Sequence, residues 1–292
     1  MRINDLLVAA LVCIVWGLNA VAAKIGVSHI PPVFFTAMRF VFVLMVLSPW
    51  LKPVPGKWGE LIPAVFFMGG FHFALIFKGA QLSDASTMSI VNQLYVPFAA
   101  LIAIFALGET VPWQRWLGIG TALLGVTIFS LDATVSEHLP GVAFLVADGL
   151  VMAIGTVLLR RISGIPPFVV QAWMAAVGLP FLLAVSFLFE EGQVAALASS
   201  PWQGWAALAY TVIGGSLIGH TLYYVLLQRY EVSLVASVLL PGPAIGVLAG
   251  VVFLGEPFTP MIVLGSFLTI AGVFIVLRRN RRITAIEPAE GV

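Results

Sequence analysis

The stretch FALGETVPWQRWLGIGTALLG, residues 105–125, returns near the other end of the chain as VFLGEPFTPMIVLGSFLTIAG, residues 252–272. The spacing between the two is constant, because the glycines and the acidic residue of the first stretch recur 147 residues later. It aligns Gly108, Glu109, Gly118 and Gly125 with Gly255, Glu256, Gly265 and Gly272. Self-similarity at a fixed spacing indicates a duplicated structural unit, so we expect the two halves of the chain to share one fold.

The composition indicates whether this fold forms in water or in a membrane. Hydrophobic residues make up 61% of the 292 residues, and charged residues only 9%. Because so few charges cannot cover the surface of a soluble protein of this length, we predict an integral membrane protein. The formal net charge of +1 gives no indication of nucleic-acid binding, and the single cysteine, Cys13, cannot form an internal disulfide.

Ten apolar segments are long enough to cross a bilayer as helices, since about 20 residues span a hydrocarbon core of about 30 Å. They are 6–26, 32–51, 61–82, 85–107, 113–131, 140–162, 166–189, 205–228, 233–254 and 260–277. The connections are short and rich in proline, glycine and charge, as in KPVPGKWGE at 52–60. We therefore predict an all-α integral membrane protein with ten transmembrane helices and no soluble domain.

The duplication extends beyond the opening stretch. SHIPPVFFTAM at 28–38 matches SGIPPFVVQAW at 163–173, and QLSDAS at 81–86 aligns with QRYEVS at 228–233. Each copy holds five predicted helices, an odd number, so the second copy has to enter the membrane upside down relative to the first. We predict two inverted five-helix repeats, 1–135 and 136–280, followed by a cytoplasmic tail at 281–292.

Lysine and arginine set the predicted orientation, because they gather in cytoplasmic loops. With the N-terminus inside, the cytoplasmic side receives Arg2, Lys52, Lys57, Arg115, Arg160, Arg161, Arg229, Arg278, Arg279, Arg281 and Arg282, whereas the outer side receives Lys24 and Lys78. Both termini are therefore predicted to be cytoplasmic. Residues 1–22 also resemble a cleaved signal peptide. However, Lys24 aligns with Arg160 at the end of the sixth segment, so the first segment has a counterpart and is expected to be retained.

An inverted repeat predicts a mechanism as well as a fold. Two copies of one sequence in opposite orientations can adopt slightly different conformations, and exchanging these opens a central site to each side of the membrane in turn. We therefore expect a secondary transporter that works by alternating access. The alternatives are a duplication kept only for packing, a passive channel and an intramembrane enzyme.

No motif supports an enzyme or a cofactor. The sequence contains no G-x-x-x-x-G-K-[ST] phosphate loop, no H-E-x-x-H metal motif and no evident Ser/His/Asp or Cys/His set. Gly118 and Gly120 resemble the start of a dinucleotide fingerprint, but its third glycine is missing and no strand precedes them. We assign no catalytic residue, no metal ligand and no cofactor.

The fourth and ninth segments are interrupted at corresponding positions. Pro97 lies well inside the fourth, and Pro241, Gly242 and Pro243 lie inside the ninth. A proline has no N–H, so a backbone carbonyl loses its helical partner and can receive the ammonium group of a ligand. These residues predict a hinge or helix break beside a substrate site. A plain kink tolerated by neighbouring helices is an equal alternative.

Polar and aromatic side chains at similar depth mark the predicted site. The set consists of Trp16 and Asn19 in the first segment, His72 in the third, Asn92 and Tyr95 in the fourth, and His220 and Tyr223 in the eighth. Polar groups inside a membrane usually face a cavity or another helix. We assign this set to substrate binding. For each residue taken alone, an interhelical hydrogen bond is the competing interpretation.

Charged residues near or within the predicted helices are further candidates. Asp148 lies inside the sixth segment, where a charge costs roughly 3 kcal/mol. It is a candidate for relaying a coupling proton or holding a substrate ammonium; a wet vestibule or a basic partner are the alternatives. Arg39 is expected to snorkel or pair, and Lys24 to mark the outer end of its helix. Glu109 and Glu256 are expected to cap the following helix or to bind a loop.

With these features the chain resembles the EamA branch of the drug/metabolite transporter superfamily. The resemblance rests on WGLNAVAAK at 16–24, on Arg39-Phe40 after PPVFFTAM, and on the LGE segments with the glycines that follow them. It covers about residues 5 to 278. The second copy departs from the pattern, because MAIGTVLLRR at 152–161 replaces the first motif and Met174 stands where Arg39 would repeat.

The resemblance implies a ten-helix secondary transporter of the inner membrane that exports small metabolites, and within the family it points to aromatic amino-acid exporters of the YddG type. We therefore expect the export of amino acids, with broad or aromatic-leaning selectivity; exporters of nucleosides or drugs are the alternative. The expected partners are a small-molecule substrate and membrane lipid, without nucleic acid. A monomer is compatible with these features.

Overall fold

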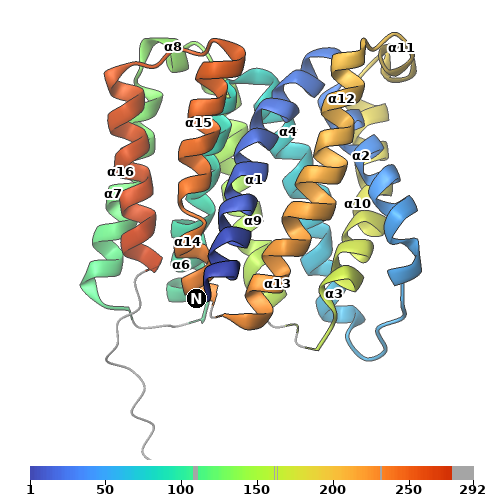
Figure 1. Ribbon diagram of the computed structural model, residues 1–292, viewed down its shortest axis with the longest axis horizontal. Coiled ribbons are helices and arrows are strands. Elements are labelled where there is room, and N and C mark those ends of the chain that lie inside the picture. The colour runs from blue at the N-terminus through green and yellow to red at the C-terminus, as the bar shows by residue number, and fades with distance from the viewer. Residues whose placement is uncertain (108–110, 161, 163, 231, 278–292) are drawn as a thin grey trace, which may run out of the picture.

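The computed structural model describes residues 1–107, 111–160, 162, 164–230 and 232–277, and in this part of the chain every regular element is a helix. Gly108, Glu109 and the predicted tail at 281–292 lie outside the described residues. The helices are α1 (Ile3–His29), α2 (Pro32–Leu47), α3 (Trp58–Val65), α4 (His72–Leu82), α5 (Ala85–Val91), α6 (Tyr95–Leu107), α7 (Trp113–Ser130), α8 (Ala133–Ser136), α9 (Leu139–Arg160), α10 (Pro167–Phe189), α11 (Gln193–Ala198), α12 (Trp202–Tyr210), α13 (Thr221–Arg229), α14 (Val232–Val238), α15 (Pro241–Leu254) and α16 (Pro260–Leu277). The long ones stand side by side as a bundle (Figure 1).

These helices follow the predicted apolar segments. The third, fourth, eighth and ninth segments are each divided into two helices, namely α3 and α4, α5 and α6, α12 and α13, and α14 and α15. Within the described ranges, seven helical stretches are long and apolar enough to cross a membrane. The chain is therefore an all-helical, multi-pass membrane protein.

Helices α2 and α10, which are the second helices of the two predicted copies, pack against each other in opposite directions. Both begin at the second proline of the sequence Ile-Pro-Pro, because the N–H that a proline lacks would have no partner in the first turn of a helix. At one end, the Glu190 carboxylate after α10 accepts the N–H groups of Val33 (2.9 Å) and Phe34 (3.0 Å) of α2. At the other end, the rings of Trp50 and Phe168 lie 5.5 Å apart. Equivalent helices of the two copies thus run antiparallel here.

The repeated glycines form the interface between α7 and α16, at the far end of the molecule from α2 and α10 (Figure 1). A Cβ atom on Gly118 would lie 2.9 Å from the carbonyl oxygen of Gly272, and a Cβ atom on Gly272 would lie 2.7 Å from that of Gly118. Gly125 and Gly265 face each other in the same way, at 2.8 and 2.7 Å. These helices are also antiparallel, with touching backbones. The glycines occur twice in the sequence because each half supplies one side of a symmetric contact.

Replacing Gly125 by leucine is expected to separate α7 from α16 and to destabilise the protein. The first side-chain carbon would already lie 2.4 Å from the backbone nitrogen of Thr269, and overpacking of this kind costs about 1–3 kcal/mol. The melting temperature of the purified protein in detergent measures the effect. The matched control is Gly120→Leu on the same helix, where nothing lies within 4 Å of a Cβ atom. Equal melting temperatures for the two variants would contradict this packing.

Two π-helical turns, which the sequence analysis did not predict, interrupt the third and eighth segments. They are Phe66–Phe71, between α3 and α4, and Thr211–His220, between α12 and α13. Each contains a Gly-Gly pair, and the second helix of the other half packs on it: Met174 of α10 lies against Gly69, and Arg39 of α2 lies against Gly215. Such turns are rare in proteins, and those that occur are often found at functional sites.

The interruptions of the fourth and ninth segments precede the prolines that predict them. The chain is 3₁₀-helical at Asn92–Leu94, and Pro97 is the third residue of α6. In the ninth segment α14 ends at Val238, and Pro241 is the first residue of α15. A proline is tolerated in the first turn of a helix. Each proline therefore lies in the first turn of a new helical segment and does not bend a continuous one.

The acidic residue of the repeated motif joins the two halves. Gly255, with φ of +68°, ends α15 in the left-handed conformation that glycine favours. Glu256 then accepts the N–H groups of Ala85 (2.7 Å) and Ser86 (2.9 Å) and the Ser86 hydroxyl at the start of α5. The expectation that Glu256 caps the helix after it is therefore wrong, because it caps a helix of the first half across the interface.

Candidate functional site

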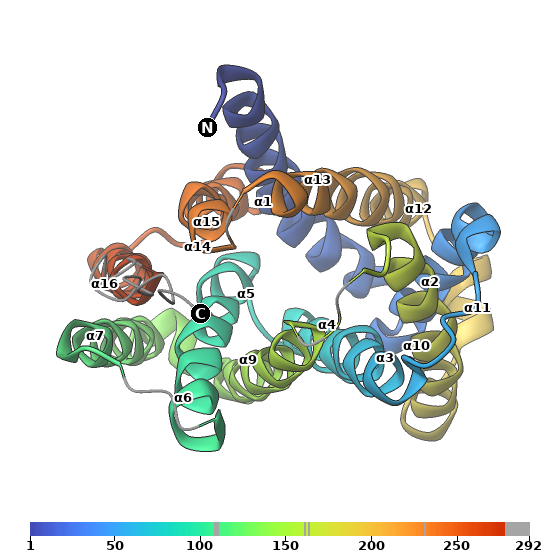
Figure 2. The same ribbon diagram turned by 90° about the horizontal axis from the view of Figure 1, so that it is seen from below.

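A cavity of about 420 Å³ lies inside the bundle, and both halves of the chain contribute to its wall. Viewed along the bundle in Figure 2, α1, α4, α5, α9 and α13 surround the central region. The seven residues predicted to bind substrate all line the cavity: Trp16, Asn19, His72, Asn92, Tyr95, His220 and Tyr223. Among the predicted break residues, Gly242 and Pro243 line it, whereas Pro97 and Pro241 do not. These nine lining residues come from five of the ten predicted segments, namely the first, third, fourth, eighth and ninth.

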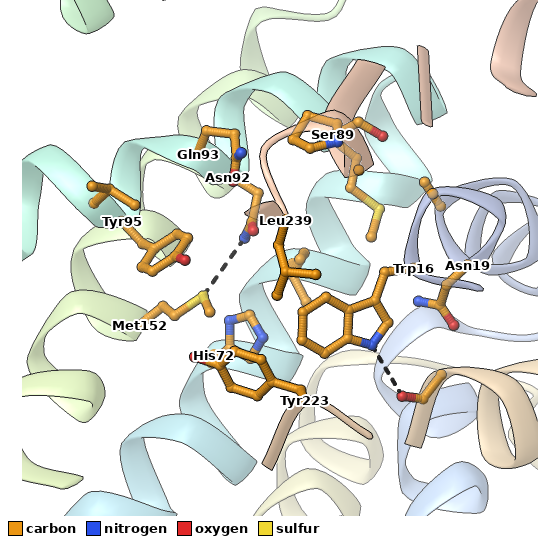
Figure 3. Close-up of a pocket in the computed structure, with 18 of the residues that line it drawn as sticks. Trp16, Asn19, His72, Ser89, Asn92, Gln93, Tyr95, Met152, Tyr223 and Leu239 are labelled. Atoms are coloured by element: carbon orange, nitrogen blue, oxygen red, sulfur yellow. Dashed lines mark hydrogen bonds between the residues drawn. The ribbon is translucent and has the colours of Figure 1, made fainter. Parts of the chain in front are cut away.

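One wall of the cavity is aromatic. The Trp16 ring contacts the rings of His220 and Tyr223, with centroids 5.3 Å apart in both cases. The indole N–H of Trp16 donates to the carbonyl oxygen of Gly215 at 3.3 Å (Figure 3), and His220 Nδ1 lies 2.7 Å from the same oxygen. Because a carbonyl only accepts, Nδ1 of His220 carries a proton. The π-helical turn that contains Gly215 therefore fixes two rings of the wall.

A buried polar network supports another part of the cavity wall. Asp148 of α9 is fully buried, and its Oδ1 lies 2.5 Å from His72 Nδ1 of α4. Its Oδ2 accepts a hydrogen bond of 2.8 Å from Asn92 Nδ2, in the 3₁₀ turn. Asn92 also approaches the sulfur of Met152 at 4.0 Å (Figure 3). Asp148 does not line the cavity itself, so His72 and Asn92 carry its influence to the cavity surface.

Two cations make contacts that the sequence analysis did not specify. Arg39 does not snorkel to the membrane surface: it is 2% exposed, lines the cavity and donates from Nε to the Ser216 hydroxyl at 2.9 Å. Its guanidinium lies 4.9 Å from the centre of the Phe73 ring, which is a cation–π contact. Lys24 donates from Nζ to three carbonyls at the end of α4. Lys24 therefore caps a neighbouring helix in addition to lying near the end of its own.

The break in the ninth segment exposes backbone carbonyls to the cavity wall. Pro243 has no N–H to offer the carbonyl four residues earlier, at Leu239, and the N–H of Gly242 donates to it instead at 3.0 Å. That oxygen and the one of Val238 lie 3.6 and 3.7 Å from the Cys13 thiol, which is a weak donor. Both Cys13 and Leu239 line the cavity. Besides Gly242, only the weak thiol donor contacts the Leu239 oxygen in the described part of the chain, so a stronger donor can replace the thiol there.

The sequence analysis missed several lining residues for identifiable reasons. Met152 and Phe73 line the cavity, but an apolar residue in an apolar helix carries no signal. Gly215 was indistinguishable from the packing glycines, although the Gly-Gly pair inside an apolar segment was a signal for a helix irregularity. Arg39 was noted as an intramembrane charge, and that feature was sufficient to place it in a cavity. In the part of the chain that the structure describes, no group of three or more His, Cys, Asp or Glu residues could hold a metal ion.

Comparison with known proteins adds to this geometry. The sequence model of the EamA-like transporter family matches residues 4–131 and again residues 139–278. A protein of Salmonella typhimurium named "Probable amino-acid metabolite efflux pump" is 28% identical over 93% of this chain and 94% of its own length. A protein of Escherichia coli with the same name is 27% identical, with the same coverage. An uncharacterized transporter of Archaeoglobus fulgidus is 26% identical over 94% of this chain and 99% of its own.

A solved structure supports the fold. A crystal structure with 19% sequence identity superposes with a TM-score of 0.64, covering 94% of this chain and 98% of its own. At this identity the similarity concerns the arrangement of the helices alone. The double match of one family model to the two halves agrees with the duplication that the glycine motifs predict.

Proposed function

This chain belongs to the EamA-like transporter family, and we propose that it exports amino acids across the inner membrane with broad or aromatic-leaning selectivity. It is a membrane transporter of small molecules and not an enzyme. The observation that carries the proposal is the central cavity, in which apolar and aromatic side chains surround a few polar groups. Such a lining suits a ligand with a charged head and an apolar side chain. Two relatives named as amino-acid metabolite efflux pumps support the same substrate class.

The proposed architecture is ten transmembrane helices arranged as two inverted five-helix repeats, 1–135 and 136–280. The antiparallel packing of α2 on α10 and of α7 on α16 supports it, because these pairs join equivalent helices of the two copies. The matched interruptions support it too. In this arrangement Pro97, Pro241, Gly242 and Pro243 would serve as hinges for alternating access.

Both termini are proposed to be cytoplasmic. Reporter domains fused after Val292 or inserted within residues 56–60 should therefore report a cytoplasmic location, and insertions within residues 135–139 a periplasmic one. The distribution of lysine and arginine predicts this orientation in the membrane. A periplasmic C-terminus would contradict both the orientation and the inversion.

Asp148 and His72 are proposed to hold the proton that is exchanged for substrate. A carboxylate with no solvent exposure is costly unless it is neutralised, and a proton between Asp148 and His72, whose atoms lie 2.5 Å apart, would neutralise it. His72 also faces the cavity, so the pair has a route to a ligand or to water. Asn92 orients the second carboxylate oxygen.

The growth of cells in the presence of toxic amino-acid analogues tests the proposed export. Cells that overproduce this protein should tolerate higher concentrations of toxic amino-acid analogues, because export lowers the concentration inside. The control is a Gly125→Leu variant, which is expected to disturb the fold. Unchanged tolerance across a wide panel, at confirmed expression, would count against amino acids and leave nucleosides or drugs as the better substrate class.

A further inference from the structure

Arg39 is a buried cation without a charged partner in the described residues. Its side chain is 2% exposed, and the only ion pairs found in the described ranges are His72 with Asp148 and Arg229 with Asp5. The rings of Phe73 and Phe77 lie 4.9 and 5.9 Å from the guanidinium carbon. Aromatic faces attenuate the cost of burying a guanidinium but do not neutralise its charge. An anionic ligand would therefore balance the positive charge of Arg39.

The terminal donors of Arg39, Nη1 and Nη2, are available. Its Nε–H donates to Ser216, whereas no hydrogen bond joins Nη1 or Nη2 to a residue that the structure describes. Asn19 Oδ1 lies beside it, buried and without a hydrogen-bond partner in the described part. Both groups approach the place where a Cβ atom of Gly215 would be, at 3.3 Å for Arg39 Nη2 and 2.4 Å for Asn19 Oδ1. Only glycine at this position leaves room for both.

The second half of the chain contains an internal control for the role of Arg39. Met174 occupies the equivalent position in the repeated sequence, and it packs on the glycine pair of the other π-helical turn, at Gly69. An apolar side chain therefore satisfies the packing requirement at this kind of contact. A packing role does not explain why the first half carries a charge, so the charge points to a ligand.

Among the described residues that line the cavity, Arg39 is the only lysine, arginine, aspartate or glutamate. Asp148, the other buried charge nearby, contacts His72 at 2.5 Å and does not line the cavity. We propose that Arg39 binds the carboxylate of the substrate through its two Nη groups, and that this protein selects molecules with a carboxylate over cationic amines of the same shape. A guanidinium suits this task, because its paired N–H donors match the two carboxylate oxygens. The inference rests on the proposed export of amino acids and specifies which end of the molecule is recognised.

Ligand binding to the purified protein tests this inference without any transport. The probes are phenylalanine, 3-phenylpropionate, which lacks the amine, and phenethylamine, which lacks the carboxylate. Their binding is measured as stabilisation against thermal unfolding over a concentration series. The wild type should bind the two carboxylates at least about tenfold more tightly than phenethylamine, and Arg39→Met should abolish the difference by a tenfold to hundredfold loss for the carboxylates. Arg39→Lys should retain part of it, and Met174→Leu, at the equivalent position, should leave it unchanged.

The outcomes separate the two proposals. Binding of 3-phenylpropionate that requires Arg39, without binding of phenylalanine, would overturn amino-acid export and keep the anion site. Equal binding of phenethylamine and the carboxylates, or unchanged discrimination in Arg39→Met, would overturn the role of Arg39. A second readout is independent of ligand affinity: Cys13, the single cysteine, lines the same cavity. Its labelling by an anionic methanethiosulfonate relative to a cationic one should fall about tenfold in Arg39→Met, and an unchanged ratio would contradict the proposal.

Discussion

Asp148→Asn should abolish substrate accumulation driven by a pH gradient while leaving the exchange of substrate for substrate nearly intact. If the protein exchanges one proton for each substrate molecule, a gradient of two pH units supports about a hundredfold ratio of substrate concentrations across the membrane. Each pH unit is worth about 1.4 kcal/mol. A carrier that has lost its proton site equilibrates its substrate, so the ratio should fall from about 100 to about 1. Asparagine has nearly the shape of aspartate and can still bond to His72 and Asn92, which keeps the network of Asp148 assembled.

The measurement uses inside-out vesicles or liposomes with an acidic interior and a radiolabelled amino acid outside. Exchange in the same preparation, without a gradient, controls for folding, because a structural defect would reduce both activities. Ser186→Ala is a further control: Ser186 is buried away from the cavity, with its hydroxyl bonded to Glu190. Accumulation by Asp148→Asn at the level of the wild type would show that the coupling proton resides elsewhere.

Trp16→Ala should weaken substrate binding by at least about tenfold. The indole forms contacts with His220 and Tyr223 and a hydrogen bond to Gly215, so its removal deletes contact area and releases the other rings of the wall. Truncating a buried tryptophan typically costs about 3–5 kcal/mol in a protein core, and aromatic anchors of this kind dominate binding energies. Tyr223→Ala should act in the same direction with a smaller effect. The apparent KM for exchange and the thermal stabilisation by phenylalanine measure both.

The matched control for Trp16 is Trp202→Ala, because the Trp202 side chain is 74% exposed on the outside of the bundle. It removes the same group without touching the cavity. Trp16→Phe preserves an aromatic ring and loses the N–H donor, so it should give an intermediate affinity. If Trp16→Ala and Tyr223→Ala leave the KM and the substrate preference intact in folded protein, the aromatic wall serves to pack helices and the substrate binds elsewhere.

The fold was largely predictable because its signals are strong and local. Apolar length predicts the helices, and the recurrence of Gly118 and Gly125 as Gly265 and Gly272 predicts a duplication. The sequence does not indicate which residues each motif contacts in the folded protein. Nothing in the pattern indicates that the repeated glycines touch one another, or that Glu256 reaches back to α5. Such contacts depend on the assembled bundle, in which residues far apart in the chain become neighbours.

The candidate site was predictable to the extent that polarity marks it. His72, Asn92 and His220 stand out because a polar group inside a membrane needs a partner or a cavity, and the structure brings them to one cavity. Asp148 was identified as a buried charge, but its partners come from two other segments and could not be chosen from spacing. The π-helical turns depend on how α2 and α10 pack on them. The sequence aligns Met174 with Arg39, but only the structure shows that the two side chains pack on equivalent glycine pairs, at Gly69 and Gly215.

The central claim is that amino acids are transported through this cavity by alternating access. Counterflow in liposomes tests it most directly. Liposomes with the purified protein are loaded with unlabelled phenylalanine, diluted into a trace of labelled phenylalanine and followed over time. The account predicts a transient accumulation of label that saturates with concentration and shrinks in Trp16→Ala, because a carrier exchanges one bound molecule for another. Uptake that neither saturates nor responds to the internal load would indicate a channel, and the absence of counterflow for every amino acid tested would contradict the proposed function.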